Sequence, residues 1–138
     1  MIAPLIARLK TLPELRMVEG LAEWSVLDEP PLLTPAAYVL PGTTEAARNG
    51  VASGGFRQQL REAAQLVLLV RNLRDPQGAA ATQDLVAIRD AVRASVLGWS
   101  PPGCTPIELV SGSLTGMEAD VVVWRDLVAC ETQFFKTS

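Results

Sequence analysis

The sequence predicts an α+β fold, in which residues 1–138 form a single domain with a mostly antiparallel, four- to five-stranded sheet and two main helices packed on one face. Three observations lead to this prediction. The 138 residues match the size of one ordinary domain, and 49% of them are hydrophobic. Two segments carry apolar residues at helical spacing, whereas several others are short or alternating apolar runs. No internal repeat or linker divides the chain.

The N-terminal residues predict a helix followed by a short strand. Apolar residues at helical spacing define one helix face: Ile2, Leu5, Ile6 and Leu9. Leu12-Pro13 is expected to end this helix. Residues 16–19 alternate polar and apolar, which is typical of a strand, and Gly20 stops it. Residues 21–27 could form one helical turn or two.

The middle of the chain contains two expected strands and one long loop. Residues 36–40 are apolar and predict a strand that Pro41-Gly42 closes. Residues 42–55 contain four glycines and no clear period, so we expect a long functional or mobile loop. Residues 56–72 fit a helix in their first half and a strand in their second. We predict one long strand there, mainly on the resemblance described below.

The clearest helix extends from about residue 79 to residue 97, with Gly98 as its C-cap. Its expected buried stripe consists of Ala81, Leu85, Ile88, Val92 and Val96. Asp90 and Arg93 are expected together on the outer face.

The C-terminal part predicts two strands. Residues 107–111 alternate, a turn is expected around 117–120, and the long run 121–135 predicts a strand with a bulge or twist. Trp99 is expected in the core, whereas Trp24 could be either a core residue or an interface anchor.

The composition excludes most catalytic chemistry. The chain has no histidine, which removes the commonest general base and metal ligand, and two cysteines alone cannot complete a zinc site. The acidic residues are scattered, and only a pair such as Glu108 with Glu131 could converge across the final hairpin. The glycine-rich residues 50–55 lack the lysine of a phosphate-binding loop. We therefore expect no catalytic residue, no metal and no cofactor.

The net charge and the cysteine content limit the partners and the cellular compartment that we expect for the protein. The net charge of −3 argues against a dedicated nucleic-acid binder, and ten of the twelve cationic residues are arginines, which suit protein interfaces. Cys104 and Cys130 are expected to be reduced. Because residues 1–8 show no secretory pattern and no apolar run approaches the length of a membrane span, we expect a protein made in the cytoplasm and not held by a membrane.

An ordered series of short motifs resembles the phage tail terminator family of long-tailed phages and prophages. The first half of the series is Val18-Glu19-Gly20, residues 34–39, Arg57-Gln58, Val70-Arg71-Asn72, Asp75 and Gly78. The second half is Leu85, Ile88-Arg89, Ala91-Val92-Arg93, Leu97-Gly98-Trp99, Pro101, Glu108, Gly112, Trp124-Arg125-Asp126 and Thr132. The likeness covers nearly the whole chain, although Val123-Trp124 and Ala64 differ from the family pattern.

The resemblance implies a structural virion protein and not an enzyme. It implies a homo-hexameric ring that caps the head-proximal end of the tail tube, stops tube polymerisation and offers a joining surface to neck or head-completion proteins. The implied partners are further copies of the chain, the tail tube protein, the neck protein and the tail sheath, while DNA passes through the lumen without specific binding. The implied location is the virion tail, with assembly in the host cytoplasm.

The expected subunit or tube interface is the glycine-rich segment, since a long loop can supply a docking surface. The candidate residues are Thr43, Thr44, Glu45, Arg48, Asn49, Ser53, Phe56 and Arg57. The alternatives are another phage neck or tail-completion protein, a small enzyme that uses carboxylates, or a ligand-binding module with an apolar pocket.

Overall fold

The structure is a computed structural model that describes every residue except 32, 72–78, 119 and 138. Of residues 79–82 and 117–118 it describes the backbone and not the side chains. Its elements are α1 (Ile2–Leu9), β1 (Met17–Glu19), α2 (Leu21–Ser25), β2 (Ala36–Ala46), β3 (Gly55–Arg71), α3 (Ala79–Val96), β4 (Glu108–Glu118) and β5 (Val121–Thr137). One sheet has the strand order β1-β2-β3-β5-β4, in which only β1 and β2 pair in parallel. The predicted α+β class is therefore confirmed.

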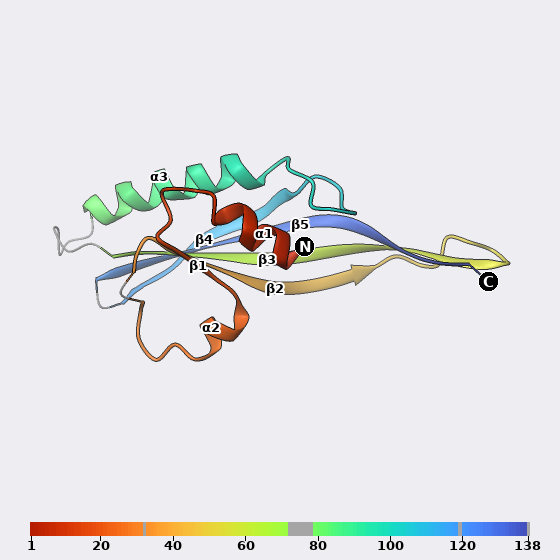
Figure 1. Cartoon of the computed structure of the whole chain (residues 1–138), viewed down its shortest axis with the longest axis horizontal. Helices are drawn as coiled ribbons and strands as arrows, with labels where there is room; N and C mark the ends of the chain where they lie inside the picture. The colour runs from red at the N-terminus through yellow and green to blue at the C-terminus, as the bar shows by residue number, and fades with distance from the viewer. Residues whose placement is uncertain (32, 72–78, 119, 138) are drawn as a thin grey trace.

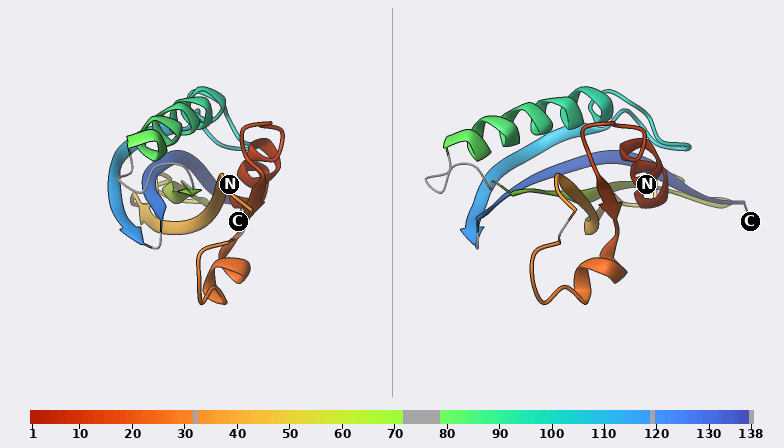
Figure 2. Two further views of the ribbon diagram at one scale, coloured as in Figure 1. Left: turned by 90° about the vertical axis from the view of Figure 1, so that its left-hand side faces the viewer. Right: turned by 60° about the vertical axis from the view of Figure 1, so that its left-hand side comes forward.

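The two main helices, α1 and α3, cover one face of the sheet, as Figures 1 and 2 show. The main core lies between them and the sheet, where Leu5 and Leu9 of α1 and Val92 of α3 are buried against residues such as Leu66. Short α2 lies on the opposite face, where Trp24 packs edge-on against Tyr38 with ring centroids 5.1 Å apart. Alternate residues of β2 and β3 point to the two faces, as strand geometry requires.

The predicted long strand at 56–72 is confirmed as β3, the centre of the sheet. Residues 66–70 are buried on both faces, which explains why the sequence there is a continuous apolar run. The end assigned to the preceding strand was wrong, because β2 continues past Pro41-Gly42 to Ala46. A register shift between Pro41 and Thr44 accommodates the proline, which cannot donate to the ladder. The connecting loop is therefore residues 47–54 and not 42–55.

Beyond the helices, β2, β3 and β5 continue as a narrow projection that we call the arm, residues 43–62 and 130–137 (Figure 1). β3 and β5 pair without interruption to its end, where Gly55 lies opposite Thr137. We call residues 47–58 and 133–137 the arm tip. Past Cys130, which is buried in the core, most residues of the arm are exposed to solvent or to a partner.

α3 and the final hairpin agree with most predictions for them. Leu85, Ile88, Val92 and Val96 are buried as expected, whereas the Ala81 side chain lies outside the described residues. Gly98 has a φ of +83°, which suits its role as the C-cap. The predicted bulge lies in β4 rather than β5, since the register shifts fall between Leu109 and Ser111 and between Leu114 and Gly116.

The prediction for Asp90 and Arg93 was half wrong. Asp90 is exposed, but Arg93 reaches inward to the sheet and pairs with Asp126 on β5. Helical spacing alone places both residues near one side of α3, and only the sheet carboxylate determines that Arg93 turns inward.

Candidate functional site

The arm tip exposes aromatic side chains. Phe134 and Phe135 are 54% and 64% exposed, and Phe56 contacts Phe134 edge-on with centroids 6.0 Å apart. In the ladder, Phe135 lies opposite Arg57, and Phe56 lies opposite Lys136. Because cross-strand neighbours share a face, each face of the arm tip carries one exposed phenylalanine and one cation. Exposed aromatic rings on a rigid support are typical of protein contacts.

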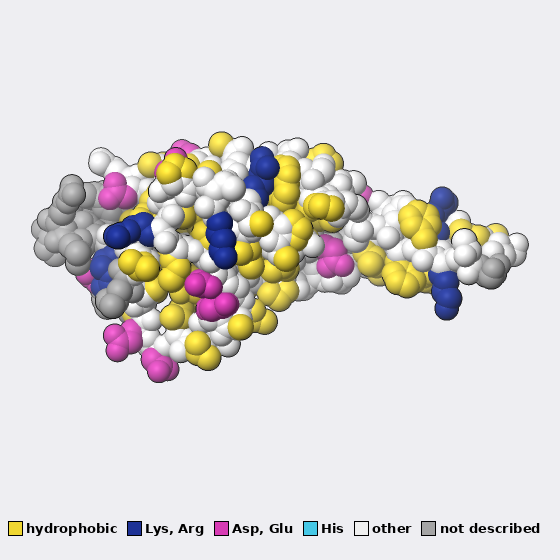
Figure 3. Space-filling view, in the orientation of Figure 1, with side chains coloured by type: hydrophobic (Ala, Val, Ile, Leu, Met, Phe, Trp, Pro, Cys, Tyr) yellow, Lys and Arg dark blue, Asp and Glu magenta, His cyan; other side chains and the backbone are white. Residues whose placement is uncertain are grey.

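The charged side chains of the arm tip are all cations. They are Arg48, Arg57 and Lys136, and the arm-tip ranges contain no Asp or Glu. Figure 3 shows cationic side chains at the end of the arm, well away from the carboxylates of the body. In a chain of net charge −3, this part of the molecule therefore has the opposite sign to the whole.

The loop at the arm tip is held by hydrogen bonds. Asn49 Oδ1 accepts the backbone N–H groups of Val51 and Arg57, both at 3.0 Å. The Gly50 N–H donates to the Arg57 carbonyl at 2.8 Å, and Gln58 Nε2 donates to the Ala47 carbonyl at 2.7 Å. The Asn49 side chain therefore stabilises the turn, as asparagine side chains commonly do by bonding to nearby backbone groups.

The structure brings the predicted interface residues onto the arm. Thr43, Thr44 and Glu45 lie on β2, Thr44 Oγ1 donating to Glu62 Oε2 at 2.7 Å, and the others follow in the loop and at the start of β3. Phe134, Phe135 and Lys136 were missed, because no local pattern indicates that β5 accompanies β3 to the end of the arm. The only available signal was two adjacent phenylalanines near a polar end of the chain.

A second exposed surface surrounds α2, and we call it the α2 groove. It has a volume of about 280 Å³ and is lined by Trp24, Leu27, Asp28, Glu29, Pro30, Leu69, Val121 and Val123. Leu21 and Val26 add exposed apolar area beside it. Trp24 packs on Tyr38 with one side, as a core residue would, and lines the groove with another, so its role as an interface anchor stays a prediction.

The α2 groove has an acidic rim. Asp28 and Glu29 line the groove itself, while Arg125 lies over the Trp24 ring at 5.4 Å and Arg71 Nη2 donates to the Pro31 carbonyl at 3.3 Å beside it. Backbone N–H groups of Glu23 itself and of Gly20 lower the pKa of the Glu23 carboxyl, with the Gly20 N–H 3.1 Å from Oε2. Asp28 and Glu29 form no ion pair with any described residue. The groove therefore combines an apolar floor with two carboxylates that form no ion pair among the described residues.

The outer edge of β4 is a third accessible surface. Leu109, Val110 and Leu114 are exposed, and β4 pairs on one side only. A free strand edge carries unpaired N–H and C=O groups that another chain can meet.

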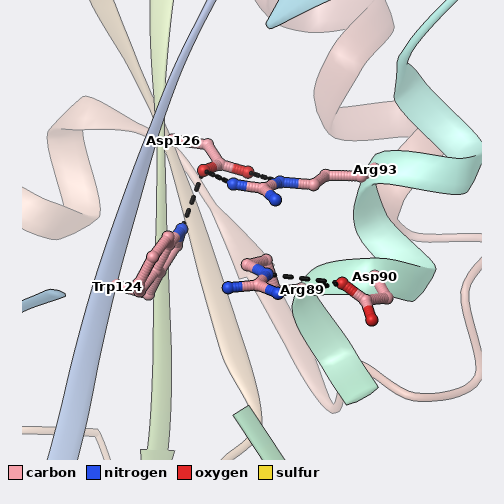
Figure 4. A network of polar contacts seen from close by, with 5 residues as sticks. All are labelled: Arg89, Asp90, Arg93, Trp124 and Asp126. Atoms are coloured by element: carbon pink, nitrogen blue, oxygen red, sulfur yellow. Dashed lines mark hydrogen bonds and ion pairs between the residues drawn. The ribbon is translucent and has the colours of Figure 1, made fainter. Parts of the chain in front are cut away.

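The most heavily constrained polar cluster is structural and lies between α3 and β5 (Figure 4). Asp126 is fully buried and accepts two hydrogen bonds from Arg93, each at 2.8 Å. Trp124 Nε1 donates to the same carboxylate at 2.7 Å, and Arg89 lies 4.9 Å from the Trp124 ring centroid. Hydrogen bonding to Asp126 raises the pKa of Arg93. The cluster fixes α3 to the sheet and leaves no reactive group free.

The two carboxylates considered for enzymatic chemistry lie near each other, since Glu108 and Glu131 line one open pocket of about 270 Å³ together with Arg61. Glu108 lies opposite Ala129 in the β4–β5 ladder, and Glu131 lies opposite Arg61 in the β3–β5 ladder. Glu131 Oε2 also accepts a hydrogen bond from Gln59 Nε2 at 2.6 Å.

Among the described residues no group of three or more potential metal ligands is found. No helix within the described residues is both long enough and apolar enough to span a membrane.

Cys130 gives a prediction about thiol reactivity and pH. Neither cysteine forms a disulfide, and burial together with a contact from Cys104 raises the pKa of Cys130 to about 12. We expect iodoacetamide at pH 8 to modify Cys104 well before Cys130 in the folded protein, as mass spectrometry of peptides would show. Equal rates would contradict this.

The raised pKa of Cys130 also makes the stability of the fold depend on pH. Because the folded pKa lies above the ordinary value of 9.0, the Cys130 thiol stabilises the fold below pH 9 and loses that contribution as the pH rises from 9 to about 12.

The family model described as "Phage tail terminator protein" matches residues 2–135. Among solved structures, a chain of the one described as "Virion of native gene transfer agent (GTA) particle" has a TM-score of 0.58 and 14% sequence identity. The match covers 97% of this chain and 95% of that chain. No curated protein matches the sequence.

Proposed function

Since this chain belongs to the phage tail terminator protein family, we propose that it forms a ring that caps the head-proximal end of a tail tube. The family is structural, so the chain is a structural component of a virion tail and not an enzyme. In the proposed role, one domain spanning residues 1–138 assembles into a hexamer, stops tube polymerisation and presents a joining surface to a neck or head-completion protein. The tail tube protein, and the sheath where one exists, complete its set of partners.

The observation that carries the proposal, besides the family, is that the chain exposes separate surfaces of different character. A closed ring is built from head-to-tail contacts, which need two different patches on each subunit. The arm tip is cationic and aromatic, whereas the α2 groove is acidic and apolar. The fold of the gene transfer agent virion chain, shared over nearly all of both chains, is consistent with a virion role.

The ring is tested by mass measurement in solution together with negative-stain imaging, first of the pure protein and then of the protein mixed with tail tubes. We expect particles of six subunits that bind one end of a tube and prevent its further growth. A protein that stays monomeric in both settings and leaves tube growth unchanged would contradict the proposed function. Binding to a portal instead of a tube would favour another neck protein.

We propose further that residues 43–55 become protected when the subunit docks on a neighbour or on the tube. Arg48 is exposed in the loop and provides a trypsin site, and exposed Lys10 at the end of α1 provides a control site away from the arm. We expect cleavage after Arg48 to be at least about tenfold slower in assembled tails than in free subunits. Equally fast cleavage after Arg48 in the two states would count against docking through this loop.

A further inference from the structure

We propose that the arm tip of one copy docks into the α2 groove of a second copy, and that this contact joins neighbouring subunits. The inference rests on the proposed ring and deepens it by assigning its subunit interface.

The first argument is charge. The arm tip carries Arg48, Arg57 and Lys136 and no carboxylate, whereas the charged residues that line the groove are both carboxylates, Asp28 and Glu29. Asp28 and Glu29 at the rim have no ion-pair partner among the described residues. Opposite potentials of this kind steer two surfaces together and fix their register.

The second argument is apolar fit. The arm tip exposes the rings of Phe134 and Phe135, and the groove presents Trp24 and Leu27 around a hollow of about 280 Å³. A phenylalanine that enters such a hollow loses its contact with water and gains aromatic and aliphatic neighbours. An aromatic anchor in a pocket surrounded by charge pairs is the usual anatomy of the energetic centre of an interface.

The third argument identifies the occupant as another copy. Leu69 and Val123, which line the groove, face each other at one end of the β3–β5 ladder, while Gly55 and Thr137 close its other end. The 14 residues from Phe56 to Leu69 span about 40 Å of strand. Figure 1 shows the arm tip and α2 at separate parts of the molecule. Because rigid strands hold them apart, an arm cannot reach its own groove.

Two such patches on one subunit produce a head-to-tail contact that propagates from copy to copy. It closes into a ring when the rotation per subunit divides a full turn. Docking of this kind removes one exposed phenylalanine of every subunit from solvent at once.

The contact is tested with two charge-reversed proteins. The arm variant carries Arg57→Glu and Lys136→Glu, and the groove variant carries Asp28→Arg and Glu29→Arg. We expect each variant alone to associate at least about tenfold more weakly than the wild type, because like charges then face each other. An equimolar mixture should regain association, since each reversed arm meets a reversed groove and each native arm meets a native groove. Native mass spectrometry should find the two variants in alternation, in equal numbers.

Asp84→Arg, on the exposed side of α3, is the matched control and should assemble as the wild type does. Thermal unfolding checks that all variants are folded. If the wild type forms rings and the two variants form them equally well, or the mixture fails to recover, the assigned contact is wrong while the ring stands. If the wild type forms no ring, either free or on tubes, the proposed function and this inference both fail.

Discussion

Replacing Arg93 with leucine is expected to lower the free energy of unfolding by about 3–5 kcal/mol. Asp126 is fully buried, and Arg93 is the only cation that forms an ion pair with it among the described residues. Without the guanidinium, the carboxylate keeps a single hydrogen bond, from Trp124 Nε1. A buried charge that loses its counter-charge is one of the few single changes that cost so much. Urea unfolding at pH 7 measures the effect.

Replacing the other partner, Asp126, with leucine should lower the free energy of unfolding less than Arg93→Leu does. Replacing both residues with leucine should lower it less still. Asp126→Leu leaves Arg93, whose side chain is 24% exposed and can regain water. With both partners changed to leucine, no buried charge remains, so part of the loss should return. Asp90→Ala is the control, because that carboxylate is 61% exposed in its pair with Arg89 and should contribute less than about 1 kcal/mol. An Arg93→Leu variant no less stable than Asp90→Ala would show that the cluster does not hold α3.

The sequence predicted well what local patterns encode. Helical spacing identified α1 and α3, and Gly98 correctly marked the end of α3. The same patterns predicted the class of the fold, because two amphipathic helices and several short strands have few ways to bury their apolar sides.

The arm was not predictable in the same way, because it depends on pairing between distant residues. Glycine content and the absence of a period made residues 42–55 look like one loop, although β2 extends through Ala46 after its register shift. Likewise, the polar residues at the start of β3 are held in a strand by β5, which lies more than 70 positions later in the chain. Strand pairing of this kind overrides local propensity.

Four of the motif residues that carried the family likeness turn out to meet at one place. Arg93 of α3 and Trp124 and Asp126 of β5 form the cluster in Figure 4, and Gly112 of β4 lies against the same three side chains. Their spacing along the chain does not predict this contact. The likeness therefore reflected the packing of the fold at this point as much as its assembly surfaces.

Gly112→Ala is the second substitution expected to have a large effect, at the upper end of about 1–3 kcal/mol for overpacking. Gly112 lies opposite Asp126 in the β4–β5 ladder. A Cβ there would overlap Asp126 Oδ1 and would lie 2.7 Å from Arg93 Nη2 and 3.0 Å from the Trp124 ring. None of these groups can give way easily, because each one holds the others in place. The backbone at Gly112 is not in the left-handed region, so space rather than conformation requires glycine.

Gly50→Ala supplies the matched control, since a Cβ at Gly50 would meet its nearest neighbours at 3.7 Å, an ordinary contact distance. Thermal or urea unfolding should find that variant close to the wild type. The steric cause is separated from a general weakness of β4 by combining Gly112→Ala with Asp126→Ala. If crowding of the carboxylate is the reason, the alanine at 112 should cost much less once Asp126 is shortened, and the two changes should not add. Additive losses would place the damage in the strand itself and not in the cluster.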